Sequence, residues 1–145
     1  MQFDKENCLS DSQVFTGAAT VSTNSFKKQT AAQDLSIGDR KAVVVLPTVD
    51  AGAGSTQVLE AIQADDGALT TNVTVIGSIT LPAAKVTKGK MIEIPIAQGM
   101  MTQQYLGWRH TATGGITTLT AEAYIVRQEE LTLYKSFPKQ VNAAV

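Results

Sequence analysis

Three consecutive segments decide the fold: Met91-Ile-Glu-Ile-Pro-Ile96, Gln104-Tyr-Leu-Gly-Trp-Arg-His110 and Thr118-Leu-Thr-Ala-Glu-Ala-Tyr-Ile-Val126. In the first segment, Ile92, Ile94 and Ile96 fall on one side, because successive side chains of a strand point to opposite faces of a sheet. In the third segment, every second residue from Leu119 to Ile125 is apolar in the same way. A period of two rather than 3.6 predicts three β-strands.

The Gly114-Gly115 pair separates the second and third segments. Glycine readily adopts the positive φ angles that a tight reversal of the chain requires. We therefore expect these two strands to form an antiparallel hairpin.

The same reasoning predicts further strands upstream. Lys41-Ala-Val-Val-Val-Leu46 is an unbroken apolar run, typical of a central strand covered on both faces, and Pro47 can end it because proline has no N–H for the ladder. The segment Thr56 to Ala64 has some helical spacing. Its short length and the turn signal Asp65-Asp66-Gly67 favour a strand.

The segment from Thr71 to Leu81 also alternates. It places Val73, Val75, Ile79 and Leu81 on one face, with Ile76 as the exception. Gly77 in its middle predicts a β-bulge or the close approach of another backbone. Pro82 to Lys85 is expected to form one helical turn, and Lys88-Gly89 a turn into the next strand.

A chain of 145 residues fits one domain, and at this length it can bury a substantial core. About eight strand-sized segments separated by turns predict an all-β protein, an antiparallel β-sandwich or jelly roll over residues 1–145, with a closed barrel as the alternative.

Both ends are expected to be extended arms. Residues 1–12 form a polar N-terminal arm that carries the isolated apolar residues Phe3 and Leu9. Residues 128–145 form a C-terminal arm that is too apolar for a solvated tail. We expect such arms to pack on the body of the same subunit or on a neighbour, and their apolar residues are the candidate interface residues: Phe3, Leu9, Leu131, Leu133, Tyr134 and Phe137.

Charge and composition argue against several classes. The formal net charge is −1, with no run of like charges, whereas a nucleic-acid binder usually carries a basic stripe. The acidic N-terminus lacks the basic and apolar regions of a signal peptide, and no apolar run has the length of a membrane span, so we expect a protein kept in a cytoplasm-like compartment. The single cysteine, Cys8, excludes an intrachain disulfide and is expected to be a free thiol.

The residues that carry chemistry are too few for a site. His110 is the only histidine, so the chain lacks the usual ligands of a zinc site and the usual residue pattern of a catalytic triad. We therefore interpret His110 as a sheet-surface residue. The glycine-rich loop at Gly52 to Thr56 lacks the Gly-Lys-Ser/Thr ending of a phosphate-binding loop. Tyr105 and Trp108 have opposite parity, so they cannot share a stacking surface. We expect no enzyme activity, no metal and no cofactor.

A short polar N-terminal arm is followed along the chain by seven segments: Gly38-Asp-Arg-Lys-Ala-Val-Val-Val45, Leu59-Glu-Ala-Ile-Gln-Ala-Asp-Asp-Gly67, Lys88-Gly89, Ile94-Pro95, Gln104-Tyr-Leu-Gly-Trp108, Gly115 to Val126 and Tyr134-Lys-Ser-Phe-Pro138. In this order, these features resemble the jelly-roll capsid cement (decoration) proteins of tailed bacteriophages. The resemblance covers residues 9 to 139, and the family often has an Arg where this chain has Gln104.

The resemblance implies a structural virion protein on the outer surface of the capsid. Many copies would bridge neighbouring major capsid proteins, and the chain would form a homo-oligomer, a dimer or trimer, through residues 1–15 and 128–140. It implies no nucleic-acid or membrane partner. A carbohydrate- or receptor-binding jelly roll of a phage particle is the alternative, although aromatic residues make up only 6% of the chain. An enzyme of the cupin type would need more histidines than one.

Overall fold

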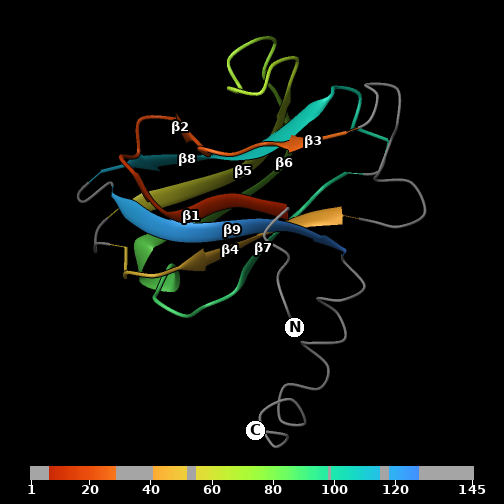
Figure 1. The fold of residues 1–145 in the computed structure, drawn as a ribbon. Helices are drawn as coiled ribbons and strands as arrows, with labels where there is room; N and C mark the ends of the chain where they lie inside the picture. Colours follow the sequence, from red (N-terminus) through yellow and green to blue (C-terminus); the bar gives the residue numbers. More distant parts are fainter. Residues whose placement is uncertain (1–6, 29–40, 52–54, 98, 115–117, 128–145) are drawn as a thin grey trace, which may run out of the picture.

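The computed structural model describes residues 7–28, 41–51, 55–97, 99–114 and 118–127. Within these ranges the chain is built from strands and one short 3₁₀ helix, η2 (Figure 1). In chain order the elements are β1 (Cys8–Phe15), β2 (Thr20–Val21), β3 (Phe26–Lys27), β4 (Lys41–Pro47), β5 (Thr56–Ala64), β6 (Thr74–Pro82), η2 (Ala83–Lys85), β7 (Ile92–Pro95), β8 (Tyr105–Thr113) and β9 (Leu119–Arg127).

The strands form two antiparallel sheets that pack face to face. One sheet has the order β1-β9-β4-β7, and the other has the order β2-β8-β5-β6, with β3 also paired to β8. Strands that follow one another along the chain mostly lie in opposite sheets, which is the arrangement of a jelly roll. The predicted all-β sandwich is therefore confirmed. The described part of the chain holds no helix long and apolar enough to cross a membrane.

The predicted hairpin between the second and third deciding segments is wrong. These segments form β8 and β9, and the two strands belong to different sheets. β8 pairs with β5, whereas β9 lies between β1 and β4. Gly114 does adopt a positive φ of 73°, but the chain beyond it passes from one sheet to the other.

Most of the remaining strand predictions are confirmed. β4 is an inner strand with β9 and β7 on its two sides, and Ala42 to Val45 are all at most 1% exposed, as expected for a strand covered on both faces. It ends at Pro47. The segment from Thr56 to Ala64 is a strand and not a helix.

Part of the expected N-terminal arm is a strand. Residues 8–12 belong to β1, which pairs with β9 at the edge of its sheet. Leu9, which we expected at an interface, is fully buried in the core of its own subunit. Phe3 and the C-terminal arm, residues 128–145, lie outside the described residues.

Gly77 is both the bulge and the close approach that the sequence predicts. The register between β5 and β6 shifts between Ala61 and Ile62, opposite Gly77. Because of this shift, Ile76 packs in the core with Ile79 and Leu81, while Val75 lies in the cluster on the other face. The expected face, with Val75 on the same side as Ile79, is therefore wrong.

The same glycine lets the two sheets meet along one side. A Cβ atom at position 77 would overlap the carbonyl oxygen of Pro95 in β7. Beside this contact, the Ala97 N–H donates to the Ile76 carbonyl at 3.1 Å. The edge strands β6 and β7 therefore touch at this point without belonging to one sheet.

We expect Gly77→Ala to lower the free energy of unfolding by about 1–3 kcal/mol, because the added methyl group meets backbone atoms that cannot move aside cheaply. Urea denaturation would measure the loss. Gly67→Ala is the matched control, because a Cβ there would meet Tyr105 at 3.4 Å, an ordinary contact distance. Equal stabilities for the two variants would contradict the role of Gly77.

Candidate functional site

His110 lies inside the sandwich and not on its surface, so the sequence-based interpretation is wrong. It is fully buried on β8, on the same face as Trp108, and its ring meets the Phe15 ring edge-on with centroids 5.9 Å apart. Its Nε2 atom makes a short hydrogen bond with Oε1 of Gln57. Gln57 in turn donates from Nε2 to the Ser55 hydroxyl oxygen at 2.7 Å.

The burial of His110 keeps its imidazole neutral. Burial disfavours the charged form and lowers the pKa of His110 from 6.5 to about 4. Since Gln57 presents an amide oxygen, the hydrogen of the neutral ring belongs on Nε2. The neutral His110 on β8 and Gln57 on β5 thus link two paired strands through their side chains.

The aromatic residues beside it are also structural. Trp108 is fully buried against Phe15, with ring centroids 4.2 Å apart. Its Nε1 donates to the Ser10 hydroxyl at 3.1 Å, and that hydroxyl donates to the Ala121 carbonyl at 3.1 Å. Tyr105 packs in the cluster on the opposite face of the sheet. The two aromatics form no common stacking surface, as their parity predicts.

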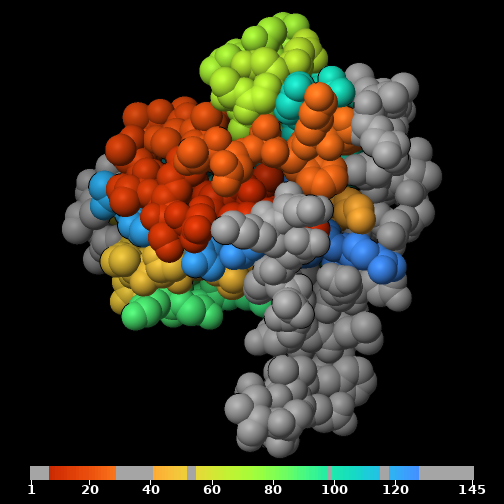
Figure 2. All heavy atoms as spheres, in the orientation of Figure 1, coloured from red at the N-terminus to blue at the C-terminus, as the bar shows by residue number. Residues whose placement is uncertain are grey.

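The turn at Asp65-Asp66-Gly67 opens a loop that projects from one end of the sandwich (Figure 2). The Asp66 carboxylate accepts hydrogen bonds from the N–H groups of Thr70 and Thr71, both at 2.8 Å. The Thr70 hydroxyl also donates to Asp66 at 2.6 Å, and this bond, followed by the one from the Thr71 N–H, lowers the pKa of Asp66. Asp65 accepts bonds from the side chains of Asn72 and Gln103, which lower its pKa. Both carboxylates are thus used to shape the loop. Within the described ranges, no three His, Cys, Asp or Glu side chains are grouped to hold a metal ion.

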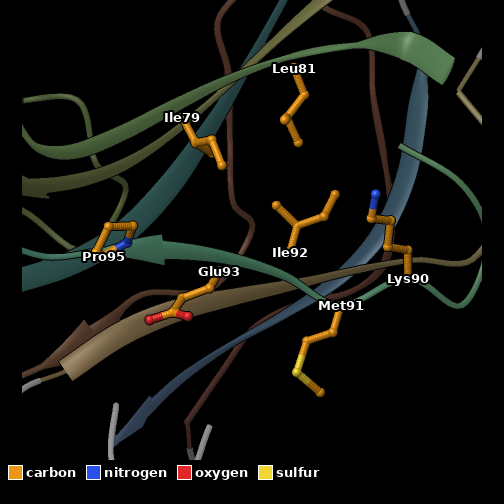
Figure 3. A pocket seen from close by; sticks show the side chains of 7 residues that line it. All are labelled: Ile79, Leu81, Lys90, Met91, Ile92, Glu93 and Pro95. Carbon is orange, nitrogen blue, oxygen red and sulfur yellow. The ribbon is translucent and has the colours of Figure 1, made fainter. Parts of the chain in front are cut away.

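An apolar groove of about 430 Å³ lies between β6 and β7, and we call it the edge groove. Figure 3 shows Ile79 and Leu81 of β6 and Ile92 of β7 pointing toward one another across it, while Met91 points away from them. Lys90 stands at its rim, while Glu93, next to Ile92 on β7, points to the far side of the strand as Met91 does. Ile79 and Leu81 are half-buried, so part of their apolar surface remains in contact with solvent.

The two strands that border the edge groove are also edge strands of the described sheets. β6 is the last strand of its sheet and β7 is the last strand of the other. Each of them pairs with only one described strand, β6 with β5 and β7 with β4. Such an edge presents N–H and C=O groups to which an extended segment can bind.

Comparison with known proteins identifies the family. The model of the Bbp16 family matches residues 9–125, which begin in β1 and end in β9. The chain belongs to the Bbp16 family. This family is associated with phages. No curated protein matches the chain.

The Bbp16 match includes only one of the six candidate interface residues. That residue is Leu9, which is buried in its own subunit. The others lie outside the match and outside the described residues: Phe3, Leu131, Leu133, Tyr134 and Phe137. The sequence analysis missed the edge groove, because alternation shows which side chains share a face but not that β6 and β7 are edge strands.

We expect the burial of His110 to make the protein less stable in acid. The pKa is lower in the folded chain than in the unfolded chain, so this stabilisation is complete above pH 6.5 and is lost as the pH falls toward about 4. Since one pKa unit corresponds to about 1.4 kcal/mol, the loss amounts to at most about 3 kcal/mol. Urea denaturation from pH 7.5 to pH 4.5 would measure it.

His110→Gln is the matched variant, because it keeps an amide that can bond to Gln57 but cannot gain a proton in this range. The carboxylates are the same in both proteins, so their contribution cancels in the comparison. A free energy of unfolding that falls equally steeply in both proteins would contradict the assignment to His110.

Proposed function

We propose that this chain is a capsid cement protein that binds the outside of a phage head and bridges neighbouring major capsid proteins. The observation that carries the proposal is the Bbp16 match over residues 9–125, which covers nearly the whole sandwich. The jelly-roll fold agrees with the cement proteins that the sequence resembles. The proposed place of action is the outer surface of the virion.

The use of the polar side chains supports a role without catalysis. His110, Trp108, Asp65 and Asp66 all make bonds that hold strands or a loop of the same chain. The apolar edge groove and the strand edges beside it are instead suited to contact with a protein. This distribution favours a chain that acts through its surfaces.

A bridging protein needs more than one contact surface, and we propose that self-association supplies one of them. The apolar residues after Arg127 are Leu131, Leu133, Tyr134 and Phe137. They follow β9, the last described strand of the sandwich. We propose that residues 128–145 join copies of the chain into a dimer or trimer.

Binding to the capsid is tested with the full-length protein and undecorated heads of the phage that encodes it. We expect saturable co-sedimentation, and heads that withstand a higher temperature once they are decorated, because the bound copies link neighbouring capsid subunits. Protein that stays in the supernatant at every concentration would contradict the proposal. A glycan array with specific hits would favour the carbohydrate-binding alternative.

Self-association is tested by truncation after Arg127. We expect the truncated chain to keep its strand content by circular dichroism but to become monomeric in native mass measurements, because the apolar segment is removed. Truncation after Lys139 is the control, since it keeps all four apolar residues. An oligomer of unchanged mass after removal of residues 128–145 would contradict this part of the proposal.

A further inference from the structure

We infer that the edge groove of one copy receives the C-terminal segment of a second copy, with Leu131 and Leu133 against Ile79, Leu81 and Ile92. This inference rests on the proposed self-association through residues 128–145, and it does not depend on capsid binding. It adds the place on the partner at which the segment is held.

The edge groove has the properties of a site for an extended chain. Its walls are apolar, Lys90 lies at the rim, and the carboxylate of Glu93 points away from the hollow. A site for a small polar ligand usually contains several polar groups that converge on it. An added strand instead uses the backbone edges for hydrogen bonds and the hollow for every second side chain.

The C-terminal segment has the matching sequence pattern. In an extended chain, Leu131 and Leu133 point to the same side, because side chains alternate between the two faces. Pro138 then limits how far such a strand can continue. The segment therefore offers a short apolar face, which suits a short groove.

Charge favours the same pairing. Glu129 and Glu130 directly precede Leu131, and Lys90 is an exposed cation at the rim of the edge groove. When the leucines enter the groove, the two carboxylates come within a few residues of the ammonium group. An ion pair of this exposed kind contributes at most about 1 kcal/mol, so it selects the direction of the segment more than it determines affinity.

The direction of the chain favours a second copy over the chain's own groove. Arg127, at the end of β9, pairs with Lys41, and Pro95 pairs with the neighbouring Ala42 on the other side of β4. β9 therefore ends at the side where β7 meets Gly77 of β6, and it points away from the Lys90 end of the groove. To lie in its own groove, the segment would have to reverse its direction directly after Arg127, whereas the segment of a second copy can enter without such a reversal.

Disulfide trapping with full-length chains tests the inference. Cys8, the only cysteine, is first changed to Ser. One preparation then carries Leu81→Cys and a second carries Leu133→Cys, and the two are mixed and oxidised. We expect a mixed dimer between the two variants, and we expect little of it when Val14→Cys replaces Leu81→Cys. Val14 is an exposed apolar residue, 58% accessible, on the edge strand β1 at the far side of its sheet.

Each outcome of the trapping decides the question. A mixed dimer supports the inference. A disulfide that forms only inside a chain carrying both Leu81→Cys and Leu133→Cys places the segment in its own groove and overturns it. A protein that is oligomeric but forms no disulfide with position 81 also overturns it, while the proposed self-association stands. A protein that is monomeric by native mass measurement overturns both.

A substitution in the groove gives a second measurement. Leu81→Glu places a carboxylate where the leucines are expected and repels Glu129 and Glu130, so we expect self-association to weaken roughly tenfold or more. Thr80→Glu is the matched control, because Thr80 is exposed on the other face of the same strand. Thermal melting confirms that both variants are folded. Equal dissociation constants for the two variants, measured by analytical ultracentrifugation, would overturn the inference.

Discussion

The burial of Trp108 between the two sheets is the constraint on which the sandwich depends. An indole N–H that is closed off from water needs an acceptor, and the Ser10 hydroxyl provides it from β1 in the opposite sheet. That hydroxyl in turn donates to the Ala121 carbonyl of β9. One chain of two hydrogen bonds therefore fixes the positions of β8, β1 and β9 relative to one another, and a slip of any of these strands would leave a buried polar group without a partner.

The strands could be predicted because each inner face is apolar at every second residue. Pairing could not be predicted in the same way, because alternation shows that a strand has a buried face but not which sheet it joins. The Gly114-Gly115 pair is equally compatible with a hairpin and with a crossing between sheets, and β8 and β9 take the second course. The sequence predicted a bulge or a close backbone approach at Gly77. It did not predict that the bulge moves the following side chains of β6 to the other face, which only the register of β5 and β6 shows.

The two errors about individual residues have different physical causes. His110 follows Leu106 and Trp108 at a spacing of two, so the alternation already placed it on the inner face, and the general preference of histidine for surfaces was the weaker signal. Residues 8–12 gave no such signal. β1 shifts register twice against β9, between Cys8 and Ser10 and between Ser10 and Gln13, and Ser12 has a positive φ of 50°. In a strand interrupted in this way, apolar residues no longer recur at every second position. The sequence of residues 8–12 therefore predicted an irregular arm and not a strand.

The two sides of the sandwich are closed to different extents, and this difference connects the fold to the proposed role. At the β1 side, Gln13 bonds to the backbone of Val21 and Thr23, and the Leu9 carbonyl accepts the Asn24 N–H, so the two sheets are joined along several residues. At the β6–β7 side they are joined around Gly77, and the edge groove lies beyond. Open strand edges invite indiscriminate pairing, and proteins limit it with bulges, prolines and lysines. This edge has all three features: a bulge at Gly77, a proline at position 95 and a lysine at position 90. Between them, only the short apolar stretch of the edge groove is left for pairing. An edge restricted in this way favours a short strand with matching side chains over a long flat one, and so it allows a selective contact of the kind proposed for the C-terminal segment.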